Sequence, residues 1–340
     1  MADQAEKDTS ELLKEILRVA GPYATFALSA RRKYAALRTQ QEREVRSIFR
    51  RLGDETAKEI RSMYRRGYGS SMGERYLEHL GPLIRGKDVS GQLQKSLRGS
   101  IEKAVDAGTS YAFDITRMQM GRTRISVEPL ERMVFRTNKQ AVDAMWARSE
   151  HGLMLSDRIW DKGVKSRNAI TEIIQNAVAT GEDPVHTARA LERYVRAGKK
   201  TVASDYPEMM NRLGNRIPGD ISYEALRLAR TETAAAYGEG TILAARATPS
   251  YTGMKWVLSS AHPKPDRCDD LAAADYGMGR GVYPPGQEPH MPAHPNCHCI
   301  LISVHEDLDI FMNRLNQWTK QPESQPDLEE WYHYVYLKVG

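Results

Sequence analysis

The stretch that decides the fold is residues 255–304, KWVLSSAHPKPDRCDDLAAADYGMGRGVYPPGQEPHMPAHPNCHCILISV. It contains all three cysteines of the chain and four of its nine histidines, and a fifth histidine, His305, follows directly. The stretch begins and ends with an apolar segment. The many prolines and glycines between these segments disfavour helices and strands. A loop of this length needs a specific reason to stay ordered. Bound metal is one such reason, and no other part of the 340 residues concentrates metal-ligand chemistry in this way.

The cysteines and histidines of this stretch predict a zinc site. Structural zinc is held by four Cys and His ligands, commonly from two chain segments. In His294-Pro295-Asn296-Cys297, the proline favours a turn that brings the first and fourth residues toward one ion. The predicted ligands are Cys268, His294, Cys297 and Cys299. Two further histidines are candidates to replace one of them: His262 and His298.

Two other interpretations of the same residues stay open. In one, the thiols are buried in a small proline-rich knot that holds no metal. In the other, zinc activates a water molecule in a hydrolase or nuclease, and Asp266, Asp269 or Asp270 acts as the base. A catalytic zinc site keeps one coordination position open, whereas the four predicted ligands fill the coordination sphere. We therefore expect a structural zinc ion, no enzymatic activity and no small-molecule substrate.

Length and composition indicate a helix-rich protein of two or three structural units. The mean hydropathy is −0.58 and 27% of residues are charged. No apolar run approaches the roughly 18–20 residues that a membrane span requires. The first residues, MADQAEKDTSELLKE, are acidic and polar, unlike a secretory signal. We therefore expect a protein that stays in the cytoplasm, where free thiols and metal ligands are commoner than disulfides.

The charge is unevenly distributed. Residues 10–66 carry 14 Lys and Arg against 7 Asp and Glu, whereas residues 306–340 carry 3 against 7. Such asymmetry indicates an anionic partner for the N-terminal part, and nucleic acid, an acidic protein surface and a membrane face all qualify. A solvated helix face in a structural arm is the plain alternative.

Most of the chain shows helical periodicity. Residues 11–66 form one apolar stripe, with interruptions expected near Gly21-Pro22 and Gly53. The turn-rich segment after it contains a short helix, 74–80. The other expected helices are one that starts near Ser90 as N-cap and is ended by the polar stretch 121–126, then 129–151, 155–180 ending at Gly181, 184–197 after Asp183, and one opened by Ser222 that runs to about 247. Small residues in the last helix predict close approach of another element, and its Arg230 and Glu232 are candidates for a buried polar tie.

Residues 254–259 and 299–304 have the apolar, β-branched composition of strands. We therefore predict a mainly α protein with a small β-hairpin unit. The expected segments are a long helical basic region at 1–130, a helical domain at 131–250, the Cys/His-rich β unit at 251–305 and a helical tail at 306–340. The tail is rich in aromatic residues and is expected to form two short helices that dock back or bind a neighbour.

The order of several short motifs resembles one protein family. Ala229-Arg230-Thr231-Glu232 precedes a Trp-bearing strand at 255–257, then come 266–269, DRCD, and 292–299, PAHPNCHC. This order resembles the Mu F-like minor head proteins of tailed bacteriophages, also called head morphogenesis proteins. The resemblance covers about residues 171–304. Many members have a second cysteine where this chain has Leu271, and an arginine where it has His298.

The resemblance implies a low-copy virion protein, assembled in the host cytoplasm with the portal and the major capsid protein. It also implies a contribution to genome packaging or to DNA ejection. Some members of this family are fused to toxin enzymes, which makes a prophage toxin an alternative. A DNA-binding module without a virion role is another. The nucleotide-binding, serine-hydrolase and metalloprotease motifs GxxxxGK[ST], GxSxG and HExxH are absent, as is the HxE…PCxxC pattern of zinc deaminases.

Overall fold

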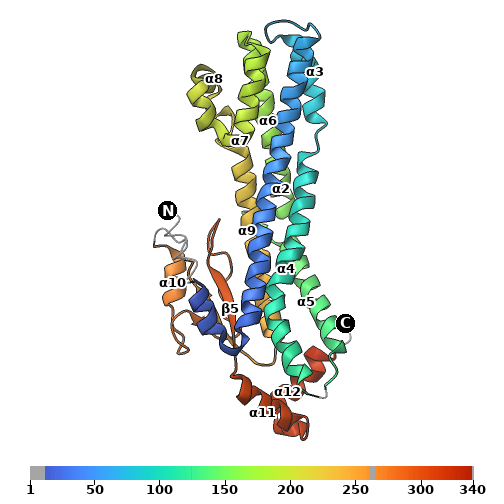
Figure 1. Cartoon of the computed structure of the whole chain (residues 1–340), viewed down its shortest axis with the longest axis vertical. Helices are drawn as coiled ribbons and strands as arrows, with labels where there is room; N and C mark the ends of the chain where they lie inside the picture. Colours follow the sequence, from blue (N-terminus) through green and yellow to red (C-terminus); the bar gives the residue numbers. More distant parts are fainter. Residues whose placement is uncertain (1–11, 124, 260–264, 339–340) are drawn as a thin grey trace. The chain divides into compact units, whose positions relative to one another are not determined.

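The computed structural model describes residues 12–123, 125–259 and 265–338, and confirms a mainly α fold with a small β unit (Figure 1). Residues 12–20 are helical and are followed by the short 3₁₀ turn η1, Gly21–Tyr23. The long helices and their short companions follow in the order of the chain. They are α2 (Ala24–Arg65), α3 (Glu74–Arg85), α4 (Val89–Gly121), α5 (Glu128–Ala147), α6 (Leu155–Thr180), α7 (Pro184–Asp205), α8 (Pro207–Leu213) and α9 (Ile221–Arg246).

The C-terminal part contains the principal sheet and three short helices. Its elements are β3 (Tyr251–Val257), α10 (Arg267–Ala273), β4 (Val282–Tyr283), β5 (Ile300–His305), α11 (Leu308–Trp318) and α12 (Pro326–Trp331). The sheet order is β4-β3-β5, and both pairings are antiparallel. A second, two-stranded sheet joins β1 (Ser149–Glu150) to β2 (Leu153–Met154).

The chain divides into two compact units that are both discontinuous in sequence. The first unit contains residues 1–38, 100–146 and 230–340, and the second contains residues 39–99 and 147–229. Helices α2, α4 and α9 each contribute residues to both units. Each of the four predicted segments is continuous in sequence. Each of these units instead combines stretches that lie far apart in the sequence.

The first unit contains the β sheet, and the N-terminal helical residues pack against it. Ile16, Ala20 and Tyr23 share a buried core with Ile115 of α4 and Ile300 of β5. The C-terminal tail docks back onto the same unit, as one of the two predicted alternatives required. Its Trp331 donates to the carbonyl of Ala247 at 2.8 Å, and its Tyr336 hydroxyl donates to the carbonyl of Ser126 at 2.7 Å. The apolar residues of the tail join the core of α4 and α5.

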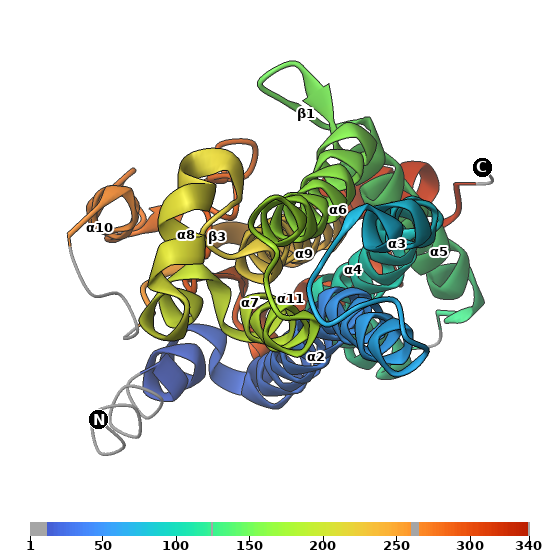
Figure 2. The same cartoon turned by 90° about the horizontal axis from the view of Figure 1, so that it is seen from above.

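The second unit is helical apart from the β1–β2 hairpin. Helix α6 contacts α3, α7 and α8 (Figure 2). The predicted end of α6 and the predicted start of α7 are confirmed, because Gly181 ends α6 with a left-handed φ of 66° and the Asp183 carboxylate accepts a bond from His186 N at 2.9 Å. An ion pair between Arg61 and Glu192, at 2.6 Å, links α2 to α7.

Several expected boundaries were wrong. Helix α2 does not break at Gly53, since the glycine is where Val195 packs against the helix. The N-cap positions belong to aspartates instead of serines: Asp88 accepts from Gly91 N at 2.8 Å, and Asp220 accepts from Tyr223 N at 2.9 Å. Helix α3 continues past the predicted end at residue 80 to Arg85, and α5 ends earlier than expected, at Ala147.

The segment after α7 also differs from the prediction. The helix was expected to end near residue 197, and its helical backbone is interrupted there, because Gly198 has φ 75°. A further helical stretch, included in α7, then runs to Asp205. The amide of Lys199 donates to the carbonyl of Gly219 at 2.7 Å, so the kink is held by the chain that returns beside it. Helix α8 then lies in what was expected to be loop.

Candidate metal centre

The two long strands of the principal sheet hold one edge of the centre. The β3–β5 pairing ends where Val257 lies opposite Ile300, so Ser259 comes two residues after the last pair on β3 and Cys299 comes one residue before it on β5. The Ser259 amide donates to the Cys299 sulfur at 3.4 Å. The strand pairing therefore fixes Cys299 at the end of the sheet.

Helix α10 positions the second sulfur. Asp266 caps the helix by accepting from the Cys268 amide at 2.7 Å, and Asp269 accepts from the Asp266 amide at 2.8 Å. This reciprocal capping box orders the first turn of a short helix that the sequence pattern did not predict. It holds Cys268 in the buried position from which its sulfur lies 3.6 Å from that of Cys297.

The predicted turn before Cys297 is confirmed. The Cys297 amide donates to the His294 carbonyl at 3.1 Å, and Asn296 has φ 61°. Pro295 in the second place and a left-handed Asn296 in the third are typical of a type II turn. The turn reverses the chain just before β5 and directs Cys297 into the same buried space as Cys268 and Cys299.

All three cysteines are buried, and their sulfur atoms lie within 4.8 Å of one another. Hydrogen bonding from the Cys299 and Cys268 thiols, aided by the backbone amides of Cys299 and Ala293, lowers the pKa of Cys297. Burial raises the pKa of Cys268, and hydrogen bonding to Cys297 raises that of Cys299. A closely spaced, buried thiol trio with one acidic member is a donor set that suits a thiophilic divalent ion. The three residues are able to hold a metal.

The fourth predicted ligand, His294, lies at the border of this trio. Its ligand atom groups with those of Cys268 and Asp266, within 4.8 Å of one another, and not with all three sulfurs. Its Nδ1 lies 3.0 Å from the carbonyl oxygen of Pro295, and its Nε2 lies 3.2 Å from Asp266 Oδ2. His294 is therefore adjacent to the centre and is held by an acidic neighbour that metal-bound histidines commonly have.

Of the two histidines that could replace a predicted ligand, only His298 lies within the described residues. His262 lies outside the described residues. His298 points its Nδ1 toward the Arg38 guanidinium at 3.3 Å. Desolvation of the ring, together with the charges of Arg38, Arg230 and Arg31, lowers the pKa of His298 to about 4. His298 is therefore neutral at neutral pH, and one ring nitrogen is occupied by the arginine.

An anchor of the proline-rich loop was missed from the sequence. The Glu288 side chain is fully buried and accepts from Arg246 Nε at 3.0 Å, Tyr251 Oη at 2.9 Å and Gly286 N at 3.0 Å. Burial alone would raise its pKa, but these donors lower the pKa of Glu288 to about 2. Met291 packs against Gly238, where an added Cβ would lie 2.6 Å from the Met291 Cβ. The loop thus has an attachment to α9 besides the cysteines.

The small residues of α9 also permit the predicted close approach of α4. A Cβ on Gly240 would lie 2.8 Å from the Val105 carbonyl, and one on Gly108 would lie 2.3 Å from the Tyr237 carbonyl. Nearby on the same helix, Glu232 is fully buried and Arg230 is half-buried. Their burial is compatible with a buried polar tie, which stays a prediction.

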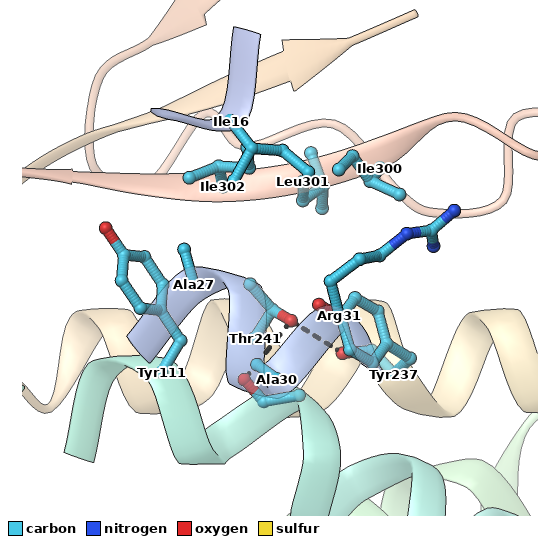
Figure 3. A pocket seen from close by; sticks show the side chains of 11 residues that line it. Ile16, Ala27, Ala30, Arg31, Tyr111, Tyr237, Thr241, Ile300, Leu301 and Ile302 are labelled. Carbon is cyan, nitrogen blue, oxygen red and sulfur yellow. Dashed lines mark hydrogen bonds between the residues drawn. The ribbon is translucent and has the colours of Figure 1, made fainter. Parts of the chain in front are cut away.

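A small pocket lies under β5, and Figure 3 shows that its walls are largely apolar. Ile300, Leu301 and Ile302 cover it from the strand, and Tyr111 and Tyr237 face them from the helices. The space is about 300 Å³, including its open mouth. None of the three cysteines lines it. The pocket and the thiol centre are therefore separate features of the first unit.

Among the helices in the described ranges, none combines the length and apolar character needed to cross a bilayer. Comparison with known proteins gives no relative: neither a protein-family model, nor a curated protein, nor a solved structure matches this chain.

Proposed function

We propose that this chain is a structural, zinc-stabilised minor head protein of a tailed bacteriophage. The observation that carries the proposal is the convergence of Cys268, Cys297 and Cys299, because the two segments that hold them are the ones on which the resemblance to Mu F-like proteins rests. In the proposed centre, His294 completes the coordination of a zinc ion. The partners implied by the resemblance are the portal and the major capsid protein.

The surroundings of the thiols favour a structural ion over a catalytic one. Two of the acidic residues that would serve as a base, Asp266 and Asp269, are used in the capping box of α10. The pocket of Figure 3 is lined by none of the cysteines. Three thiolates and an imidazole leave no coordination position for water. When bound, the ion would cross-link the start of β5, the turn at residues 294–297 and α10. This structural role requires no catalytic activity.

The N-terminal cations are the feature that a DNA contact would use. Arg32 and Lys33 of α2 are exposed, and such side chains favour a phosphate backbone or an acidic partner. We propose that this face meets DNA or the portal during assembly. A DNA-binding module outside the virion remains the second candidate function, since the same cations serve it equally well.

Metal content per chain tests the centre. We expect one zinc per wild-type chain and none in Cys297→Ser, because two sulfurs and one imidazole hold the ion far more weakly. His290→Ala is the matched control, since His290 is an exposed histidine of the same loop and should leave the zinc content unchanged. A wild-type chain that is purified without metal, and that takes up none from added zinc, contradicts the centre.

Co-purification tests the assembly role. The wild-type chain, expressed with the portal protein of its own genome, should elute with the portal ring. Salt-dependent binding to linear DNA without any portal association would favour the DNA-binding module. Zinc-dependent cleavage of DNA would favour the nuclease. Either result would replace the head-protein proposal.

A further inference from the structure

One face of α2 points an ordered array of arginines toward the centre. Arg31, Tyr34 and Arg38 are spaced by three and four residues, so they share that face. The guanidinium carbons of Arg31 and Arg38 lie 5.7 and 5.9 Å from the centroid of the Tyr34 ring. Tyr34 is buried and stacks on Tyr237, with ring centroids 4.3 Å apart. The two cations are therefore held in place by an aromatic platform.

Arg38 reaches the centre through His298. Its terminal nitrogen lies 3.3 Å from His298 Nδ1, and His298 stands between Cys297 and Cys299 in the sequence. A guanidinium only donates hydrogen bonds, so Nδ1 is the acceptor and the imidazole carries its proton on Nε2. Arg38 thereby fixes the orientation of the residue that links two predicted ligands.

The charge of this arginine array calls for a counter-charge. Within the described ranges, neither Arg31 nor Arg38 forms an ion pair with a carboxylate. Burial lowers the pKa of Arg38, as does repulsion by Arg230 and Arg31, whereas the attraction of Tyr34 and, less strongly, of Cys297 opposes that change. A desolvated guanidinium is costly unless an opposite charge compensates it. Three thiolates, one divalent ion and a neutral imidazole together carry one negative charge.

We propose that Arg38 is the electrostatic partner of an anionic three-thiolate zinc centre, and that it positions His298 so that this residue supports the centre without being a ligand. This inference rests on the proposed zinc site. It also specifies that all three cysteines bind as thiolates, because a centre with two thiolates would be neutral and would gain little from the arginine.

Competition with a chromophoric zinc chelator at constant pH tests the inference. Removing a group that supports metal ligands typically weakens metal binding about 10–100-fold, and we expect a loss in that range for Arg38→Met. Arg38→Lys keeps a cation but loses the planar fork, so its affinity should lie between those of Arg38→Met and wild type. Arg32→Met is the control, because Arg32 is an exposed cation on the same helix, and its affinity should equal that of wild type.

Cobalt substitution separates support from ligation. If Arg38 acts as proposed, Co²⁺-loaded Arg38→Met keeps the thiolate-to-cobalt absorption of the wild type, while its cobalt affinity falls. Should Arg38→Met fail to fold, Arg38→Lys takes the same measurement, since it keeps a cation at position 38 but loses the planar fork.

The results distinguish the two proposals. A wild-type chain that binds no zinc removes the zinc centre, and this inference with it. A wild-type chain that binds zinc, with Arg38→Met binding it equally tightly, leaves the centre intact and overturns the role of Arg38. A phosphate-dependent rise in the melting temperature that Arg38→Met abolishes, with zinc affinity unchanged, assigns the arginines to an external anion and also overturns it.

Discussion

At the scale of single residues, the proline-rich loop is held by chemistry of two kinds. The thiols form a predicted metal centre, whereas Glu288 is a buried carboxylate that accepts from Arg246, Tyr251 and the loop backbone. The cysteines were recognisable from the sequence because all three fall, with four histidines, in one stretch of the chain. Glu288 was not, since its partner Arg246 lies 42 residues earlier in the chain and no local pattern joins them.

Glu288→Gln should lower the free energy of unfolding by about 2 kcal/mol at pH 7, the amount typical of hydrogen bonds to a charged group. The expected loss of stability is no larger because the Arg246 side chain is 46% exposed, so water partly replaces Glu288 as its hydrogen-bond partner. Urea denaturation measures it. Glu323→Gln, at an exposed glutamate, is the control and should change nothing. A Glu288→Gln chain as stable as wild type would show that the carboxylate is not an anchor.

The same substitution should remove a pH dependence. The pKa of Glu288 is about 2 when folded, against an ordinary value of 4.5, so the unfolded chain binds a proton that the folded chain does not. Stability is therefore complete above about pH 4.5 and falls as the pH drops from there toward 2. Over that window, the wild type should lose more stability than Glu288→Gln.

At the scale of elements, periodicity predicted the long helices, and the errors lie at glycines and caps. Gly198 interrupts the helix where expected, but a second helical stretch follows it directly, and the Lys199 amide bonds to Gly219, a partner supplied by tertiary structure. Strand β4 has two residues and shows no alternation that a sequence pattern can detect. Asp88 and Asp220 took the N-cap positions that nearby serines appeared to offer, since both residue types suit that position.

Gly53 lies where α2 packs closely against Val195 of α7. A Cβ there would lie 2.5 Å from Val195 Cγ2, so Gly53→Ala should destabilise the second unit by about 1–3 kcal/mol, as overpacking commonly does. Helix propensity acts in the opposite direction, by roughly 1 kcal/mol. Gly99→Ala is the matched control, because no side chain or backbone atom lies within 4 Å of its added Cβ. It should raise the urea midpoint.

A second substitution distinguishes the clash from other causes. If Val195 is what excludes a side chain at position 53, Val195→Ala should be less harmful in the Gly53→Ala background than in the wild type, because the two changes share one space. Strictly additive losses would mean that the glycine serves another purpose.

At the scale of the whole molecule, the two compact units are the feature that the sequence did not predict. Helices α2, α4 and α9 each pass from one unit to the other, and local periodicity carries no mark at residues 38, 99 or 229 where the division falls. All three thiols, Arg38 and Glu288 belong to the first unit. The second unit contains none of the predicted ligands, so we expect its core of packed helices to stay folded without metal.

Zinc removal should therefore loosen the protein in one place. After chelation, hydrogen exchange should quicken in residues 266–273 and 293–299, because these segments carry the proposed ligands and would lose the free energy of metal binding. Residues 282–292 should keep more of their protection, since Glu288 and Met291 still attach them to α9. Peptides from residues 147–180 should exchange as before. His290→Ala with zinc should match the wild type throughout. A uniform rise in exchange across both units would mean instead that the ion stabilises the entire chain as one cooperative structure.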